Sequence, residues 1–204
     1  MIWNLGGRVL DFSGQVQLMG ILNVTPDSFY DGGRFFDPEF AIEHSLRLVE
    51  EGAAIVDIGG ESSRPPMYGT AKEVSVAEEC RRVVSVVDGL RRQSDVFISI
   101  DTVKAEVARR ALLAGADMIN DISALRQDPA MAEVAAEMKA PVVLMHRRGT
   151  ASTMQQDTHY DDLLGEVYGF LEEQVRVARS RGIEHVAVDP GLGFGKSREG
   201  SLAL

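Results

Sequence analysis

Short runs of branched apolar residues alternate along the chain with longer amphipathic segments. Six runs are typical of buried strands: residues 17–23, 54–59, 96–101, 117–122, 141–146 and 186–189. The segments between them carry apolar residues at helical spacing: residues 38–51, 76–92, 104–114, 129–138 and 160–181. Strands that alternate with helices predict right-handed βαβ units, and therefore an α/β protein with a parallel sheet.

The spacing of the strands predicts the architecture. They begin about 34 residues apart, and a closed (β/α)8 TIM barrel at that spacing needs about 270 residues, so this 204-residue chain holds about six βα units. Residues 3–13 precede the first unit and predict a hairpin that turns at Gly6-Gly7 and closes the lower mouth of the barrel. Because no linker-like stretch interrupts the pattern, we expect one domain over residues 1–204, lacking the last two units.

Charge and hydropathy along the chain argue against some classes of binding partner. The formal net charge is −10 and the chain has no dense Lys/Arg run, which argues against nucleic-acid binding. No apolar run is long enough for a signal peptide or a membrane span. The single cysteine, Cys80, fits a reducing compartment. We therefore expect a cytoplasmic protein that binds small molecules, with neither a nucleic-acid nor a membrane partner.

Polar side chains follow every predicted strand. They are Asn23, Asp57 with Glu61, Asp101, Asn120 with Asp121, His146, and Asp189. Each of them alone is explained as a turn former or a helix cap. Because the carboxyl ends of parallel strands meet at one face of a barrel, the six together predict one polar pocket there.

The glycine-rich segment 186–197 does not form a nucleotide-binding loop. Its Gly195-Lys196-Ser197 is similar to the end of a P-loop, but Pro190 stands where the first glycine of that motif belongs. Lys196 also stands where the dinucleotide fingerprint has its third glycine. The glycines instead indicate that the backbone passes close to another group.

Six motifs, in chain order, resemble those of the dihydropteroate synthase family. They are GILNVTPDSF at 20–29, DIGGESSRP at 57–65, ISIDT at 98–102, INDI at 119–122, LMH at 144–146 and DPGLGFGK at 189–196. The resemblance implies a pterin-binding TIM barrel of the folate pathway. It also implies a reaction that joins 6-hydroxymethyl-7,8-dihydropterin diphosphate to 4-aminobenzoate and releases diphosphate with Mg²⁺.

The resemblance implies a role for particular residues. The pterin is expected to be held by Asp101, Asn120, Asp189 and Met145, and the 4-aminobenzoate by Phe29, Ser63, Pro65 and Phe194. Asn23 would supply an oxygen to Mg²⁺ beside the diphosphate. The expected catalytic residues are Asn23, Arg64 and Asp101. For His146 two roles stay open: a general base, or a residue that orients loops and lines the pocket floor.

The sequence departs from the family pattern at two places. Ser63 stands where the family more often has threonine, and the loop from there to Val74 is longer than the family's short form. The family's Ser-Arg-Lys signature of the seventh strand and Arg-x-His signature of the eighth have no counterpart. We therefore expect a C-terminally truncated synthase that by itself releases no diphosphate and binds pterin weakly.

Two other functions remain as alternatives. A methyltransferase that takes a methyl group from methyltetrahydrofolate would share the pterin-holding Asp and Asn positions. A catalytically empty pterin-binding or interaction module is the other alternative. The motif at residues 25–29 and the Ser62–Pro65 stretch favour the synthase. The oligomeric state, with a homodimer as one alternative, is left open by the sequence.

Overall fold

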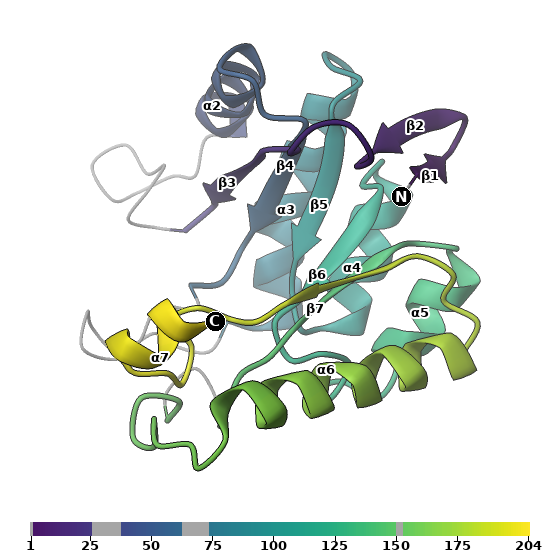
Figure 1. The fold of residues 1–204 in the computed structure, drawn as a ribbon. Coiled ribbons are helices and arrows are strands. Elements are labelled where there is room, and N and C mark those ends of the chain that lie inside the picture. The colour runs from purple at the N-terminus through teal and green to yellow at the C-terminus, as the bar shows by residue number, and fades with distance from the viewer. Residues whose placement is uncertain (1, 26–37, 63–73, 150–152) are drawn as a thin grey trace.

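A parallel sheet forms the centre of the molecule. The computed structural model describes residues 2–25, 38–62, 74–149 and 153–204. Six strands lie side by side in chain order (Figure 1): β3 Met19–Asn23, β4 Ile55–Gly59, β5 Phe97–Asp101, β6 Met118–Asp121, β7 Val142–Met145 and β8 Val186–Asp189. Every neighbouring pair in this sheet is parallel, which confirms the predicted βαβ series.

Helices connect the strands and cover the outer face of the sheet, and one short helix, α7, follows β8. Their bounds are α2 Pro38–Glu50, α3 Val76–Arg91, α4 Ala105–Leu113, α5 Met131–Glu137, α6 Leu163–Ser180 and α7 Arg198–Ala203. Capping chemistry sets where they begin and end. The Ser75 hydroxyl accepts the Glu78 N–H at the start of α3. Gly115 follows α4 with a φ of 115°, a conformation in which glycine has no steric penalty.

Alternate residues of each strand point to opposite faces of the sheet. One set packs beneath the helices and is fully buried, as Val56, Ile58, Ile98 and Ile100 are. The other set points to the inner face, where a closed barrel would have its lumen. β3 and β8 are the two outer strands of the described sheet, so the structure is a partial barrel of six units.

The amino-terminal residues form the predicted hairpin, β1 Ile2–Leu5 paired antiparallel with β2 Arg8–Asp11. Trp3 and Leu10 are buried against Ile55 and Met118, which lie at the amino ends of β4 and β6. The hairpin therefore covers the amino edge of the sheet, as predicted, and leaves the carboxyl edge to the loops. None of the helices in the described segments combines the length and the hydrophobicity that a membrane span requires.

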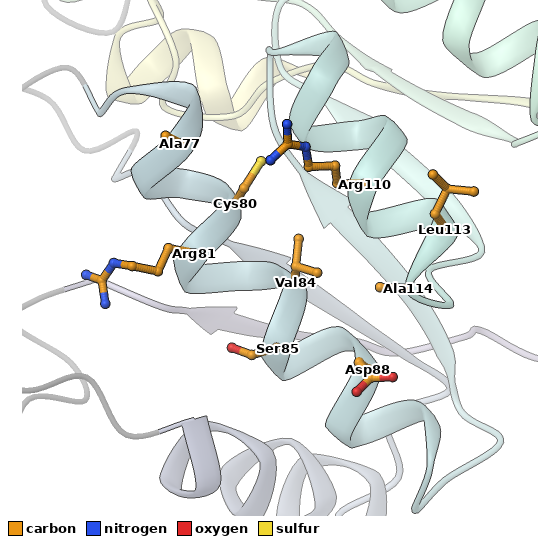
Figure 2. A pocket seen from close by; sticks show the side chains of 9 residues that line it. All are labelled: Ala77, Cys80, Arg81, Val84, Ser85, Asp88, Arg110, Leu113 and Ala114. Carbon is orange, nitrogen blue, oxygen red and sulfur yellow. The ribbon is translucent and has the colours of Figure 1, made fainter.

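A groove of about 700 Å³ runs between α3 and α4 on the outer surface (Figure 2). Cys80 and Arg110 line it from the two helices, with Val84 and Leu113 further along. The Cys80 side chain is buried, and burial raises the pKa of its thiol. The groove lies between helices and away from the strand ends, so it is not the pocket that the sequence predicts.

Candidate functional site at the carboxyl edge

The strand register brings the predicted pocket residues to one face. Asn23 pairs with Gly59, and Gly59 pairs in turn with Asp101. Asp101 pairs with Asn120 on the next strand. Because paired positions on adjacent strands point to the same side of a sheet, these side chains share the inner face at the carboxyl edge. A side chain at Gly59 would place its Cβ 3.3 Å from Asp101 Oδ2, so glycine keeps this part of the face open.

The same register continues at the other side of the sheet. Met145 on β7 pairs with Asp189 on β8, and the Met145 side chain is buried. Asp189 Oδ1 accepts the backbone N–H of Gly191 at 2.7 Å. This bond fixes the carboxylate at the start of the loop that follows β8. The structure thus brings the predicted pterin-holding residues to one edge, while their contacts with a ligand stay a prediction.

Asp57 lies one layer deeper on the inner face and is only 4% exposed. The side-chain amide of Asn120 donates to Asp57 Oδ2 at 2.9 Å. An asparagine amide has two N–H donors and one carbonyl acceptor. Among the described residues this amide makes no other hydrogen bond, so its carbonyl oxygen and second N–H are available to a ligand. Asp57 therefore orients Asn120.

Two polar atoms beside this pair are buried without a hydrogen-bond partner in the described part of the chain: Asp57 Oδ1 and Ser99 Oγ. The two residues occupy paired positions on β4 and β5, so they share the inner face. A buried polar atom without a partner costs about 1–3 kcal/mol, and most such atoms are satisfied. The inner face thus carries a polar layer around Asp57 that the described residues leave only partly hydrogen-bonded.

Several carboxyl groups lie near Asp101. Burial raises the pKa of Asp101 well above its usual range, and the negative charges of Asp57, Glu79 and Asp121 raise it further. Arg147 acts in the opposite direction. Burial also raises the pKa of Asp57, and the neighbouring Ser99 and Asn120 side chains act in the opposite direction. Carboxyl groups held together at such a cost are typical of functional sites.

His146 follows β7, and its side chain is buried. Lys196 Nζ lies 2.9 Å from His146 Nδ1. Because an ammonium group only donates, Nδ1 must accept and the ring proton must sit on Nε2. Burial, together with the Lys196 charge, lowers the pKa of His146 to about 4. Of the two roles that the sequence leaves open, the geometry favours a neutral imidazole that supports a loop over a general base.

The loop after β8 passes close to His146. Gly191 has a φ of 70°, and a side chain there would collide with the His146 carbonyl. Phe194 is half-buried on this loop, and its N–H donates to Gly191 O at 3.0 Å. The close approach that the glycines indicate is therefore an approach to β7 and its loop.

A family profile described as "Pterin binding enzyme" matches residues 19–204. The chain belongs to the pterin-binding enzyme family. The dihydropteroate synthase of Synechocystis sp. is 47% identical over 202 residues, which cover 98% of this chain and 68% of that relative. The dihydropteroate synthase of Escherichia coli K12 is 44% identical over 200 residues, which cover 97% of this chain and 69% of that relative. Dihydropteroate synthesis in the folate pathway is the function that these relatives support.

Solved structures agree with the sequence relatives. Dihydropteroate synthase of Xanthomonas albilineans, solved with 4-aminobenzoic acid, has a TM-score of 0.88 and 45% identity, over 100% of this chain and 71% of that one. The Yersinia pestis dihydropteroate synthase, solved in a sulfonamide complex, has a TM-score of 0.90 and 42% identity, over 100% of this chain and 72% of that one. The fold is therefore that of the pterin-binding enzymes.

Other polar residues at the carboxyl edge have structural partners. Glu61 pairs with Lys104 and accepts the Val74 N–H at 3.4 Å. Asp121 accepts the N–H groups of Ser123 and Leu125 at 2.7 and 2.8 Å, which shapes the turn after β6. Four predicted site residues of this pterin-binding enzyme lie outside the described residues: Phe29, Ser63, Arg64 and Pro65.

The sequence predicted Asp57 as part of the polar pocket, but it did not predict that Asp57 lies below the strand ends and accepts the Asn120 amide. The run IVDIG contains an acidic residue in the middle of a buried strand. That position is the available signal, because an ionisable side chain is rarely buried on a strand without a specific partner.

Proposed function

We propose that this chain acts as a dihydropteroate synthase. It joins 6-hydroxymethyl-7,8-dihydropterin diphosphate to 4-aminobenzoate, and the products are 7,8-dihydropteroate and diphosphate. The observation that carries the proposal is the register that places Asp101, Asn120 and Asp189 on one face at the carboxyl edge. Acceptors and donors in one pocket suit a flat heterocycle with N–H groups along its edge.

The pterin would be held by its ring edges. The Asp189 carboxylate can accept two nearly parallel N–H bonds from the 2-amino and N3 positions, a planar pairing that a hydroxyl cannot make. Asn120 offers a carbonyl oxygen and an N–H, because Asp57 holds its other N–H. Met145 supplies an apolar wall beside Asp189.

The 4-aminobenzoate would lie nearer the mouth of the pocket. We assign Phe194 to this subsite, together with Phe29, Ser63 and Pro65. The Xanthomonas albilineans relative solved with 4-aminobenzoic acid supports such a subsite in this fold. Separate subsites place the amine against the pterin methylene group, which removes much of the entropic barrier to a two-substrate reaction.

The reaction transfers the pterin-methyl group from a diphosphate oxygen to the amine nitrogen of 4-aminobenzoate. The amine nitrogen of 4-aminobenzoate forms a bond to the pterin methylene carbon, and the bond from that carbon to the diphosphate oxygen breaks with its electron pair. The amine then loses a proton to solvent. Positive charge develops on the pterin during this step, and the Asp101 carboxylate would balance that charge. Arg64 and Asn23 would bind the departing diphosphate, Arg64 by its charge and Asn23 through Mg²⁺.

Asn23 fits a magnesium site that the substrate completes. Its side chain is exposed at the end of β3 and offers an amide oxygen, a ligand that suits a hard cation. Within the described segments no three His, Cys, Asp or Glu side chains are grouped to hold a metal. Asn23 would therefore share the ion with diphosphate oxygens and water. When bound, Mg²⁺ neutralises charge on the leaving group.

The proposed function also implies a cellular location for the protein and an oligomeric state to test. We place the protein in the cytoplasm, where folate precursors are small soluble molecules and a lone cysteine such as Cys80 stays reduced. A homodimer is the assembly to test, and light scattering of the purified chain decides between a monomer and a dimer.

Calorimetry and a diphosphate-release assay test the function together. We expect the chain to bind 7,8-dihydropteroate, and any diphosphate release to require both substrates. Methyl transfer from methyltetrahydrofolate would instead identify a methyltransferase. Pterin binding without diphosphate release, both in this chain and after a seventh and an eighth βα unit are added to it, would identify a binding module. A chain that binds neither pterin nor 7,8-dihydropteroate would refute the proposal.

A further inference from the structure

Lys196 is a buried cation in the loop after β8, with 4% of its surface exposed. Its Nζ lies within hydrogen-bond distance of four acceptors: His146 Nδ1 at 2.9 Å, Gly191 O at 3.0 Å, Phe194 O at 3.1 Å and His146 O at 3.2 Å. In the part of the chain that the structure describes, no carboxylate forms an ion pair with it. The ammonium group therefore lies in a cage of carbonyl and imidazole lone pairs.

This placement is unfavourable for a lysine. Burial lowers the pKa of Lys196 to about 8, and the nearby Arg148 charge adds to the effect. The charges of Asp189 and Glu166 also face this region, since Asp189 raises the pKa of Lys196 and Glu166 raises that of His146. A charged side chain held in such a position is more typical of a functional site than of a structural core.

Three glycines leave the loop around the ammonium group with little side-chain packing of its own. Gly191, Gly193 and Gly195 all have positive φ values, at 70°, 78° and 67°. Glycine restricts its own backbone least of all residues, so hydrogen bonds must hold much of the loop's shape. Some of them come from elsewhere: Gln155 Nε2 donates to Gly193 O, and the Gly193 N–H donates to Ser201 Oγ at 3.1 Å. Lys196 binds two of the loop carbonyls from inside the loop. The Tyr160 hydroxyl donates to a third, Gly195 O, at 2.9 Å.

The loop joins the two predicted subsites. It begins at Asp189, which we assign to the pterin, and it carries Phe194, which we assign to 4-aminobenzoate. We propose that Lys196 is a positioning residue, whose ammonium group clasps the 191–195 loop against His146 so that Asp189 and Phe194 face one bound ligand together. This inference rests on the proposed function.

Substitution of Lys196 by methionine tests this positioning role. Lys196→Met keeps the length of the side chain and removes every hydrogen bond to the loop. The matched control is Arg91→Met, because Arg91 is also a cation that binds backbone carbonyls, those of Ser94 and Gly115 at 3.0 and 3.1 Å, but at the opposite edge of the sheet. Two probes separate the subsites: 7,8-dihydropteroate spans both, and 6-hydroxymethylpterin occupies only the pterin subsite.

We expect Lys196→Met to weaken 7,8-dihydropteroate binding about 30-fold and 6-hydroxymethylpterin binding only about threefold, within the range for lost charged hydrogen bonds. Arg91→Met should change both affinities less than about twofold, even where it lowers the melting temperature as much. In Lys196→Ala, added n-propylammonium should restore 7,8-dihydropteroate affinity, because it replaces the missing methylenes and amine. Equal loss for the two probes, or no rescue by the amine, would overturn the inference.

A second readout does not depend on any ligand. Amide hydrogen exchange at residues 191–195 should be slow in the parent chain and at least about tenfold faster in Lys196→Met, since the loop loses its central bonds. The imidazole nitrogen shifts of His146 should show the Nε2–H form in the parent and a mixture in the variant. If the parent chain binds neither probe, the proposed function fails. Unchanged amide exchange at residues 191–195 in Lys196→Met would separately overturn the positioning role of Lys196.

Discussion

Buried carboxylates at the two edges of the sheet differ in how many partners they have. At the amino edge, Asp117 pairs with Arg8 and Arg91 and also accepts the Ile98 N–H at 2.8 Å. At the carboxyl edge, Asp57 has one described hydrogen-bond partner, the Asn120 amide, and its second oxygen is buried without one. At the amino edge the protein itself supplies partners for the buried carboxylate. At the carboxyl edge one carboxylate oxygen has no hydrogen-bond partner among the described residues.

This difference separates stability from function within one sheet. The amino edge joins the hairpin, α3 and β6 through Asp117, so it holds together segments that are far apart in the sequence. The carboxyl edge gathers like charges whose repulsion the fold tolerates. A division of this kind is expected for barrels, where the amino face serves stability and the carboxyl face serves binding. The predictions below test whether the two edges can be perturbed separately.

The largest effect on stability should come from the amino edge. Asp117→Ala should lower the free energy of unfolding by about 2–4 kcal/mol, because it leaves Arg8 and Arg91 without their shared carboxylate. Urea unfolding measures this loss, and Asp95→Ala, an exposed neighbour on the same side, should cost less than about 0.5 kcal/mol. Affinity for 6-hydroxymethylpterin should stay within about twofold of the parent. A large loss of affinity in folded Asp117→Ala would contradict the separation of the two edges.

A smaller effect of opposite sign is expected at the carboxyl edge. Asp101→Asn should raise the free energy of unfolding by about 1 kcal/mol at pH 8, because the charged form is disfavoured beside Asp57. The gain should shrink as the pH falls, since the raised pKa means that folded Asp101 takes up a proton before the unfolded chain does. Asp88→Asn is the control, because the Asp88 side chain is half-exposed on α3 and pairs with the exposed Arg92. Ligand affinity should fall at least about tenfold, and a destabilised Asp101→Asn would show that the carboxylate is structural.

The pH dependence contributed by His146 should be of similar size. Its pKa of about 4 in the folded chain lies below the usual 6.5, so the unfolded chain binds more protons between these values. The stability from this group is present above pH 6.5 and is lost as the pH falls toward 4, by about 1–2 kcal/mol after allowance for its partial burial. His146→Gln should flatten the stability profile in this window, and the exposed control His159→Gln should not. Identical profiles would show that His146 is not held neutral.

The sequence predicted the elements because their signals are local. Each strand begins and ends within two residues of the predicted bounds, since branched apolar runs and helix-end glycines mark the boundaries. The edge residues were predictable for the same reason: a polar residue after a parallel strand must lie at the carboxyl edge. The hairpin followed from Gly6 and Gly7, which adopt φ values of 57° and 84°.

Pairings across the sheet could not be predicted in this way. The Asn120–Asp57 bond joins residues 63 positions apart, and it depends on a register that no local pattern contains. Lys196 looked like the end of a failed P-loop, because its partners are backbone carbonyls that the folded loop alone brings together. The amino-edge role of Asp117 depends on arginines from the hairpin and α3. These interactions arise from tertiary structure.

Isothermal titration of 6-hydroxymethylpterin into the parent chain and Asp189→Asn tests the central claim most directly. The substitution turns one of two acceptor oxygens into a donor that faces the ligand's own donors, with little change in size. We predict that pterin affinity falls about 100-fold or more, while the free energy of unfolding stays within about 1 kcal/mol of the parent. A pterin affinity within about twofold of the parent would contradict the claim that the carboxyl edge binds pterin through Asp189.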